Sequence, residues 1–211
     1  MRIAFSGVSS TGKSTLARAV HQKLLGLGLQ EISLVDEGMK NVYENRRAQG
    51  TAVPKFEEMP DAQKLEFQEE MIRNRCRAEF NCANFVGDGS PLDCMAFYME
   101  WLSRLLRTPS DDISAMLYRA VYRHDIIFHC PFGVINVEDD RRRFTDRVFL
   151  RKMDYILQGL TSTVCGGAHM GCPQVVKVQT ISLESRVEEV IATICRRDLL
   201  TRLAGSPSVT A

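Results

Sequence analysis

The sequence predicts an α/β fold of three layers, in which helices cover both faces of a five-stranded parallel sheet. Short apolar segments alternate with segments of helical periodicity, which is the pattern of strand–helix–strand crossovers. The chain has 211 residues, 45% of them hydrophobic, enough for one α/β core and too few for two. A glycine-rich turn joins the first strand to the first helix. We expect one domain over residues 1–203 and a disordered tail over 204–211.

Each expected strand is a short apolar run, and each expected helix has apolar residues at a spacing of 3.6 residues, as at positions 183, 187, 190, 191 and 194. Ligands bind beyond the carboxyl ends of the strands in such sheets, so the residues that follow each strand form the candidate site. The expected strands are 2–6, 31–36, 84–88, 124–129 and 174–179. The expected helices are 15–25, 61–81, 91–106, 111–122, 143–160 and 183–195.

The most specific motif runs from Gly7 to Ser14 and fits the G-x-x-x-x-G-K-[ST] phosphate-binding loop, between a strand and a helix as that motif requires. Its glycines let backbone amides turn toward a phosphate, and the helix N-terminus adds a partial positive charge. Lys13 can reach the outer phosphates, and the Ser14 hydroxyl can ligate Mg²⁺. The motif predicts that ATP is bound by Gly7, Ser9, Ser10, Thr11, Gly12, Lys13, Ser14 and Thr15.

An aspartate follows the third expected strand, where phosphoryl transfer needs a carboxylate for Mg²⁺. Asp88 is therefore expected to hold the metal ion together with Ser14. The alternative role for Asp88 is an N-cap of the next helix, but Ser90 is better placed as the cap because Pro91 follows it. Asp93, in the first helical turn, either complements the helix dipole or takes part in the site.

Two more acids, Asp36 and Glu37, follow the second expected strand, where they could orient or deprotonate an acceptor hydroxyl. Alternation along Ile32, Leu34 and Asp36 would place Asp36 on the buried face. We therefore favour Glu37, although the spacing alone does not separate the two.

Four arginines, Arg141, Arg142, Arg143 and Arg147, lie in a polar segment, residues 132–147, that follows the fourth expected strand. Because a guanidinium group matches phosphate oxygens, we expect this segment to form a lid over the nucleotide. Arg141 would bind the nucleotide. Arg143 and Arg147, one helical turn apart, would stabilise the transferred phosphoryl group. The alternative is a solvated segment whose arginines pair with nearby acids.

Composition excludes several classes of protein. Charged residues make up 25% of the chain, and its net charge of +1 is not that of a nonspecific nucleic-acid binder. No apolar run reaches the length of a membrane span. The seven cysteines are an odd number and scattered, as expected for reduced thiols of a cytoplasmic protein. Cys165, His169 and Cys172 could ligate a metal ion, but a flexible glycine-rich loop is the favoured interpretation because a fourth ligand is missing.

These motifs together resemble the small P-loop kinases, namely the nucleoside and nucleotide kinases and the ribosylnicotinamide-kinase-like group with an AAA-type ATP-binding domain. The resemblance covers nearly the whole chain and implies a P-loop NTPase fold with an arginine-bearing lid. It implies that Glu37 or Asp36 meets the acceptor hydroxyl and that residues 180–183 contact the base. The sequence departs from the family at Gly89, where an arginine usually binds substrate phosphate or sugar. Either an arginine from residues 73–77 replaces it, or the acceptor differs.

The leading hypothesis is an ATP- and Mg²⁺-dependent kinase that phosphorylates a nucleoside- or nucleotide-type acceptor. A second hypothesis makes nucleic acid the acceptor, at a strand end or on a hydroxymethylated base, because basic runs occur at 73–77, 141–147 and 196–197. A third is an ATPase or switch that acts on a protein partner. No membrane partner is expected, and a homodimer is left open. The aromatic residues Phe97, Tyr98 and Trp101 could stack an acceptor base or could pack in the core.

Overall fold

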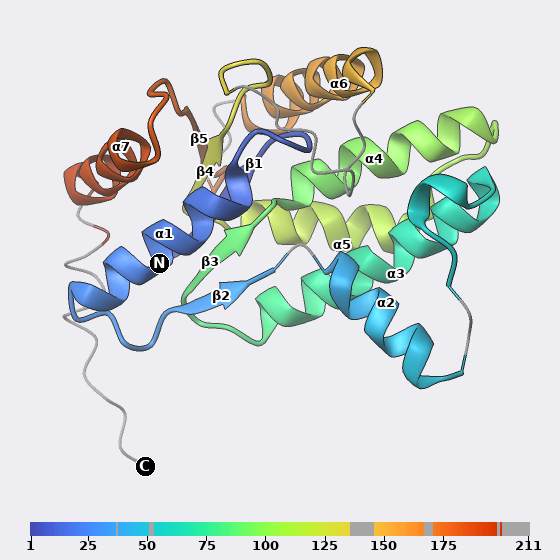
Figure 1. Ribbon diagram of the computed structural model, residues 1–211, viewed down its shortest axis with the longest axis horizontal. Helices are drawn as coiled ribbons and strands as arrows, with labels where there is room; N and C mark the ends of the chain where they lie inside the picture. The colour runs from blue at the N-terminus through green and yellow to red at the C-terminus, as the bar shows by residue number, and fades with distance from the viewer. Residues whose placement is uncertain (37, 51–52, 136–145, 167–170, 198, 200–211) are drawn as a thin grey trace.

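The structure is a computed structural model that describes residues 1–36, 38–50, 53–135, 146–166, 171–197 and 199. Its centre is a parallel sheet in the order β2-β3-β1-β4-β5 (Figure 1). β1 therefore lies in the middle, with β3 and β4 on its two sides. The strands are β1 (Arg2–Ser6), β2 (Ser33–Val35), β3 (Phe85–Asp88), β4 (Ile126–His129) and β5 (Gln174–Lys177).

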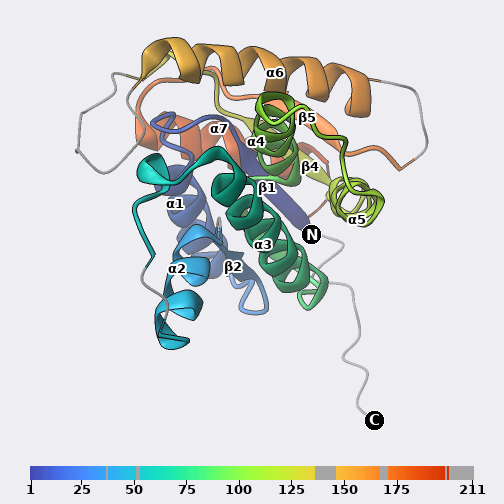
Figure 2. The same cartoon turned by 90° about the vertical axis from the view of Figure 1, so that its right-hand side faces the viewer.

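Helices cover both faces of the sheet, as Figures 1 and 2 show. Side chains of the central strands alternate between two cores: Ile126 and Phe128 of β4 join the cluster with α1 and α7, whereas Ile127 joins the cluster with α3 to α6. The first layer contains α1 (Lys13–Gly26) and α7 (Leu183–Arg196). The second contains α3 (Asp61–Phe80), α4 (Pro91–Arg104), α5 (Asp111–Tyr122) and α6 (Arg147–Cys165), with α2 (Met39–Ala48) packed against α3.

The predicted fold class is confirmed: the five expected strands and six expected helices all occur in the expected order. Two short elements were not predicted, α2 and a 3₁₀ turn at Phe56–Glu58. The predicted alternation in β2 was wrong, because Val35 is buried and Leu34 is 38% exposed on this edge strand. The tail at 204–211 and most of the lid lie outside the described residues.

The fifth predicted helix, expected over 143–160, begins later than expected. Asp146 is the N-cap of α6, and its carboxylate accepts hydrogen bonds from the backbone amides of Val148 (2.9 Å) and Phe149 (3.1 Å). The helix therefore starts at Arg147 and not at residue 143. None of the helices within the described ranges is long and apolar enough to cross a membrane.

Candidate active site

The segment between β1 and α1 forms a tight loop at the carboxyl edge of the sheet. Two of its residues have left-handed backbone conformations, Ser10 (φ 65°) and Gly12 (φ 76°). At Gly7 a Cβ atom would lie 2.5 Å from the carbonyl oxygen of Cys130, so only glycine fits where the loop leaves the sheet. The Thr11 hydroxyl closes the loop by donating to the carbonyl of Val8 at 2.9 Å.

The loop leads into the N-terminus of α1, which is suited to bind an anion. Gly12 is the N-cap of α1, no side chain in the described part of the chain caps it, and no acidic residue lies in the first turn. The first-turn amides and the helix dipole therefore favour a negatively charged group. Lys13 stands in that turn with 6% of its surface exposed, and Ser9, Ser14 and Thr15 are all at least partly exposed there.

Asp93 connects the phosphate loop to β3 and α4. Its Oδ1 accepts from the Ser6 hydroxyl at 2.6 Å and from the Gly7 amide at 3.0 Å, and its Oδ2 accepts from the Ser90 amide at 2.9 Å. Burial raises the pKa of Asp93, while the Lys13 charge and these hydrogen bonds oppose the rise. Asp93 therefore holds the loop in place, a stronger role than dipole complementation.

Arg186 of α7 supports the loop from the other face and was not predicted from the sequence. Its Nη1 donates to the carbonyl of Thr11 at 3.1 Å, and the residue is only 3% exposed. A Cβ atom at Gly12 would lie 2.8 Å from the same nitrogen, so the arginine packs directly on the loop. Because Arg186 and Thr11 are 175 residues apart, no local sequence pattern indicates this contact.

The Cys130 thiol beside the loop does not fit the role of a nucleophile. Burial raises the pKa of Cys130 to about 11, and Cys130 is fully buried. The thiol therefore stays protonated at neutral pH.

Asp88 lies at the end of β3, paired in register with Phe5 of the adjacent β1, and is 6% exposed. Ser90 and not Asp88 caps α4: the Ser90 hydroxyl accepts from the Asp93 amide, which completes a capping box. The predicted cap at Ser90 is thus confirmed, and Asp88 is not the cap of α4. One carboxylate and one hydroxyl suit Mg²⁺, which takes few protein ligands and completes its shell with phosphate and water oxygens.

Asp36 follows β2 and is exposed, so it does not share the buried face. Its Oδ1 accepts from the Gly38 amide at 2.7 Å and from the Asn41 side chain at 3.3 Å. Asp36 therefore organises the entry into α2, where Gly38 takes a left-handed conformation (φ 85°). Glu37, the favoured acid, lies outside the described residues.

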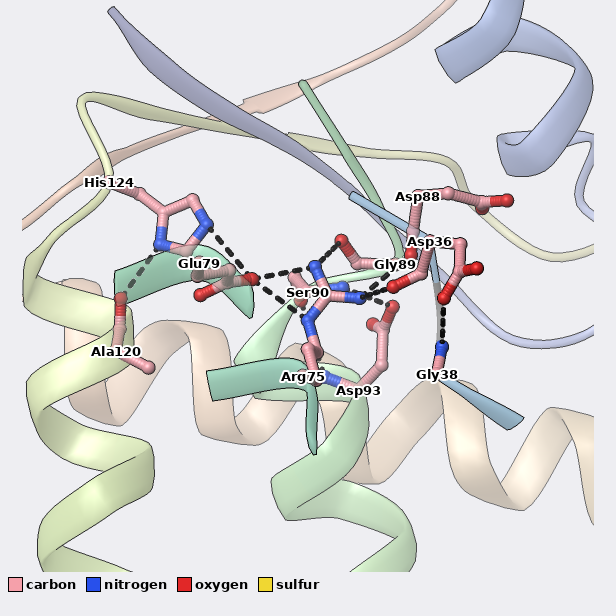
Figure 3. A network of polar contacts seen from close by, with 10 residues as sticks. All are labelled: Asp36, Gly38, Arg75, Glu79, Asp88, Gly89, Ser90, Asp93, Ala120 and His124. Atoms are coloured by element: carbon pink, nitrogen blue, oxygen red, sulfur yellow. Dashed lines mark hydrogen bonds and ion pairs between the residues drawn. The ribbon is translucent and has the colours of Figure 1, made fainter. Parts of the chain in front are cut away.

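The arginine cluster at 73–77 divides into two kinds of residue. Arg73 and Arg77 are exposed on α3. Arg75 is 1% exposed, and its guanidinium group points under the ends of β2 and β3 (Figure 3). Arg75 therefore does not simply replace the arginine missing at Gly89, because it binds backbone carbonyls, whereas a replacement by Arg73 or Arg77 stays a prediction.

Only the two ends of the predicted lid are described. At its start, Ile135 packs on the phosphate loop, since a Cβ atom at Gly12 would lie 2.9 Å from its Cδ1. At its end, Arg147 is exposed as the first residue of α6. The expected helical pairing of Arg143 with Arg147 stays a prediction because Arg143 lies outside the described residues. Arg141, Arg142 and Arg143 lie outside the described residues.

The three aromatic residues considered for base stacking belong largely to the core. Trp101 is 3% exposed and packs against Phe56 and Phe149, and Tyr98 is 2% exposed with its hydroxyl accepting from the Ser110 amide. Phe97 packs against the same core while partly exposed. After β5, in the segment for which base contact was predicted, Ile181 is 69% exposed. There the Glu189 carboxylate fixes the loop by accepting from the Thr180 amide and hydroxyl.

Comparisons with known proteins agree with this arrangement. A family model described as an AAA domain (AAA_28) matches residues 2–170. Among solved structures, the chain resembles thymidylate kinase from Ehrlichia chaffeensis, with 13% identity, a TM-score of 0.57 and coverage of 92% of this chain and 98% of that one. It also resembles deoxyadenosine kinase from M. mycoides, with 13% identity, a TM-score of 0.63 and coverage of 93% and 99%. No curated protein matches significantly.

Proposed function

This chain belongs to the AAA-domain family AAA_28 and has the fold of small P-loop nucleoside and nucleotide kinases, and from this we propose that it is an ATP-dependent kinase. Its acceptor would be a nucleoside or nucleotide. The observation that carries the proposal is the phosphate loop, which presents Lys13 and an uncapped helix end and follows β1, whose Phe5 is paired with the buried Asp88. A Gly-rich turn of purely structural use would not need a buried lysine at that point.

In this proposal Lys13 and the loop amides bind the β- and γ-phosphates of ATP. Ser14 and Asp88 would hold Mg²⁺, which supplies charge neutralisation between the phosphates when bound. Glu37, or Asp36 if its contacts with α2 loosen, would orient the acceptor hydroxyl. Arg147 and the arginines 141–143 would neutralise the charge of the transferred group, and Ile181 would lie against the adenine.

An acceptor screen with γ-labelled ATP tests this function. The panel contains deoxynucleosides, nucleoside monophosphates, ribosylnicotinamide and DNA with hydroxymethylated bases. We expect label to appear in a nucleoside or nucleotide acceptor and to require magnesium. Release of inorganic phosphate alone, at a rate that no acceptor changes, would instead indicate an ATPase that acts on a protein partner.

A second candidate function makes nucleic acid the acceptor, and the surface of α6 favours it. Arg147 and Arg151 are exposed on this helix together with Tyr155, and its one acid, Asp154, is buried, while the exposed Lys152 is paired with Glu100 of α4 at 2.7 Å. Such a face offers phosphate contacts and one aromatic surface. Transfer to DNA in the screen that falls steeply with salt, with none to free nucleosides, would favour this candidate.

A further inference from the structure

The most unusual polar group outside the phosphate loop is the buried guanidinium of Arg75 on α3. Its Nη1 donates to the carbonyl of Asp88 at 2.7 Å and, more weakly, to that of Asp36 at 3.4 Å. Its Nη2 donates to the carbonyl of Gly89 at 2.7 Å. One side chain therefore binds the chain segments that follow both β2 and β3, the two strands whose ends carry the proposed acids (Figure 3).

The charge of Arg75 is balanced within the same helix. Its Nε donates to Oε1 of Glu79 at 2.9 Å, and its Nη2 lies 2.8 Å from that oxygen. Burial alone would lower the pKa of Arg75, but the charge of Glu79, its hydrogen bond and the nearby acidic groups Asp93 and Cys94 together outweigh burial and raise the pKa. The site is shaped for this group, because a Cβ atom at Gly87 would lie 2.8 Å from Nη2.

The contacts continue to the phosphate loop. Gly89, whose carbonyl binds Arg75, is followed by Ser90, whose amide donates to Asp93. Asp93 in turn accepts from Ser6 and Gly7 at the start of the loop. A continuous set of hydrogen bonds thus joins the acceptor-side strand end, the metal-side strand end and the phosphate loop.

From this geometry we infer that Arg75 is a positioning residue for phosphoryl transfer, and this inference rests on the proposed function. By holding the carbonyls of Asp36, Asp88 and Gly89, it fixes the acid that follows β2 relative to the acid that ends β3. It acts through the backbone and touches neither ATP nor the acceptor. Misplacement of reacting groups by about 1 Å can reduce a rate about 100-fold, so loss of this bridge should reduce kcat.

Two variants separate bridging from charge balance. Arg75→Lys keeps a positive charge for Glu79, but its single nitrogen cannot reach both strand ends while it pairs with the carboxylate. The double variant Arg75→Met/Glu79→Met removes both charges, so that no unpaired carboxylate is left buried. The matched control is Arg123→Met, which removes an arginine–carbonyl hydrogen bond to Cys82 at the opposite end of β3 (2.6 Å).

We expect both Arg75 variants to lower kcat by about 10- to 100-fold, with KM for ATP changed by less than about twofold, while Arg123→Met keeps the wild-type kcat. Wild-type kcat in folded Arg75→Lys would show that only the charge matters and would overturn the inference. A double variant that fails to fold leaves this decision to Arg75→Lys.

A second measurement does not depend on catalysis. Amide hydrogen exchange at Gly38, Asp88 and Gly89 should be at least about tenfold faster in both Arg75 variants, with no change at the end of β4. Unchanged exchange at these strand ends would overturn the inference even if wild-type protein phosphorylated no acceptor. That absence of transfer, by contrast, would count against the proposed function alone.

Discussion

Two buried arginines, one from each face of the sheet, support the same edge of the sheet in different ways. Arg186 of α7 binds one carbonyl of the phosphate loop, and the nearby carboxylate is Glu189, which is partly exposed. Arg75 of α3 binds three carbonyls, and its partner Glu79 is completely buried. Loss of the Arg186 side chain would therefore leave a carboxylate that reaches water, whereas loss of the Arg75 side chain would leave one that does not.

The largest effect is expected for Arg75→Met alone. It leaves the Glu79 carboxylate buried without its counter-charge, which costs about 3–5 kcal/mol of unfolding free energy. Chemical denaturation at neutral pH measures the loss. Adding Glu79→Met should recover most of the lost stability. If Arg75→Met alone were as stable as the wild-type chain, the proposed difference between the two arginines would be wrong.

A smaller loss is expected for Arg186→Met, because Glu189 reaches water. The lost charged hydrogen bond to Thr11 should reduce the unfolding free energy by about 1.5–3 kcal/mol. Because the contact lies on the phosphate loop, ATP affinity should fall in the same variant. Titration with ATP and magnesium measures this loss of affinity. An equal loss of ATP affinity in folded Arg75→Lys would remove the distinction between Arg186 and Arg75.

A histidine lies next to the Arg75–Glu79 ion pair. His124 Nε2 lies 3.7 Å from Glu79 Oε1, and Nδ1 is 2.8 Å from the Ala120 carbonyl. Burial lowers the pKa of His124. The Glu79 charge partly opposes this decrease, and the Arg75 charge adds to it. The unfolded chain therefore takes up a proton near pH 6.5 that the folded chain does not. Stability should fall below that pH, by at most about 1.4 kcal/mol per pH unit for this group.

Thermal or urea unfolding between pH 7.5 and 5 measures this dependence. His124→Asn should make it shallower, while His129, whose pKa burial also lowers, keeps a remaining slope in the variant. Identical slopes for variant and wild type would show that His124 does not contribute.

The smallest effect is expected for Asp36→Ala. This change removes hydrogen bonds to Gly38 and Asn41 at the entry to α2 and should cost about 1 kcal/mol, as loss of a helix cap does. If Asp36 rather than Glu37 orients the acceptor, kcat should fall more than about tenfold as well. Assaying Asp36→Ala beside Glu37→Gln decides between the two acids.

Local patterns in the sequence predicted most of the fold. The phosphate loop, the Ser90 cap and the order of strands and helices depend on neighbouring residues and on alternation, so they could be read directly. The edge strand β2 was misread because it is short and one side of it reaches solvent, so Leu34 did not need to be buried.

The long-range contacts of the site could not be predicted in the same way. Nothing near Arg186 in the sequence shows that it reaches Thr11, and nothing in residues 73–77 distinguishes the buried Arg75 from its exposed neighbours except the spacing to Glu79. Gly87 and Gly89 offered a partial signal, since glycines at a strand end allow a large side chain to approach the backbone.

The most direct test of the central claim, that the loop from Gly7 to Ser14 binds ATP, is calorimetric titration with magnesium and ATP. We predict a saturable heat for a single site in the wild-type chain. In Lys13→Ala this heat should be lost, although the variant should still unfold as the wild-type chain does. Absence of heat from any purine triphosphate, or equal affinity in the Lys13 variant, would contradict the account.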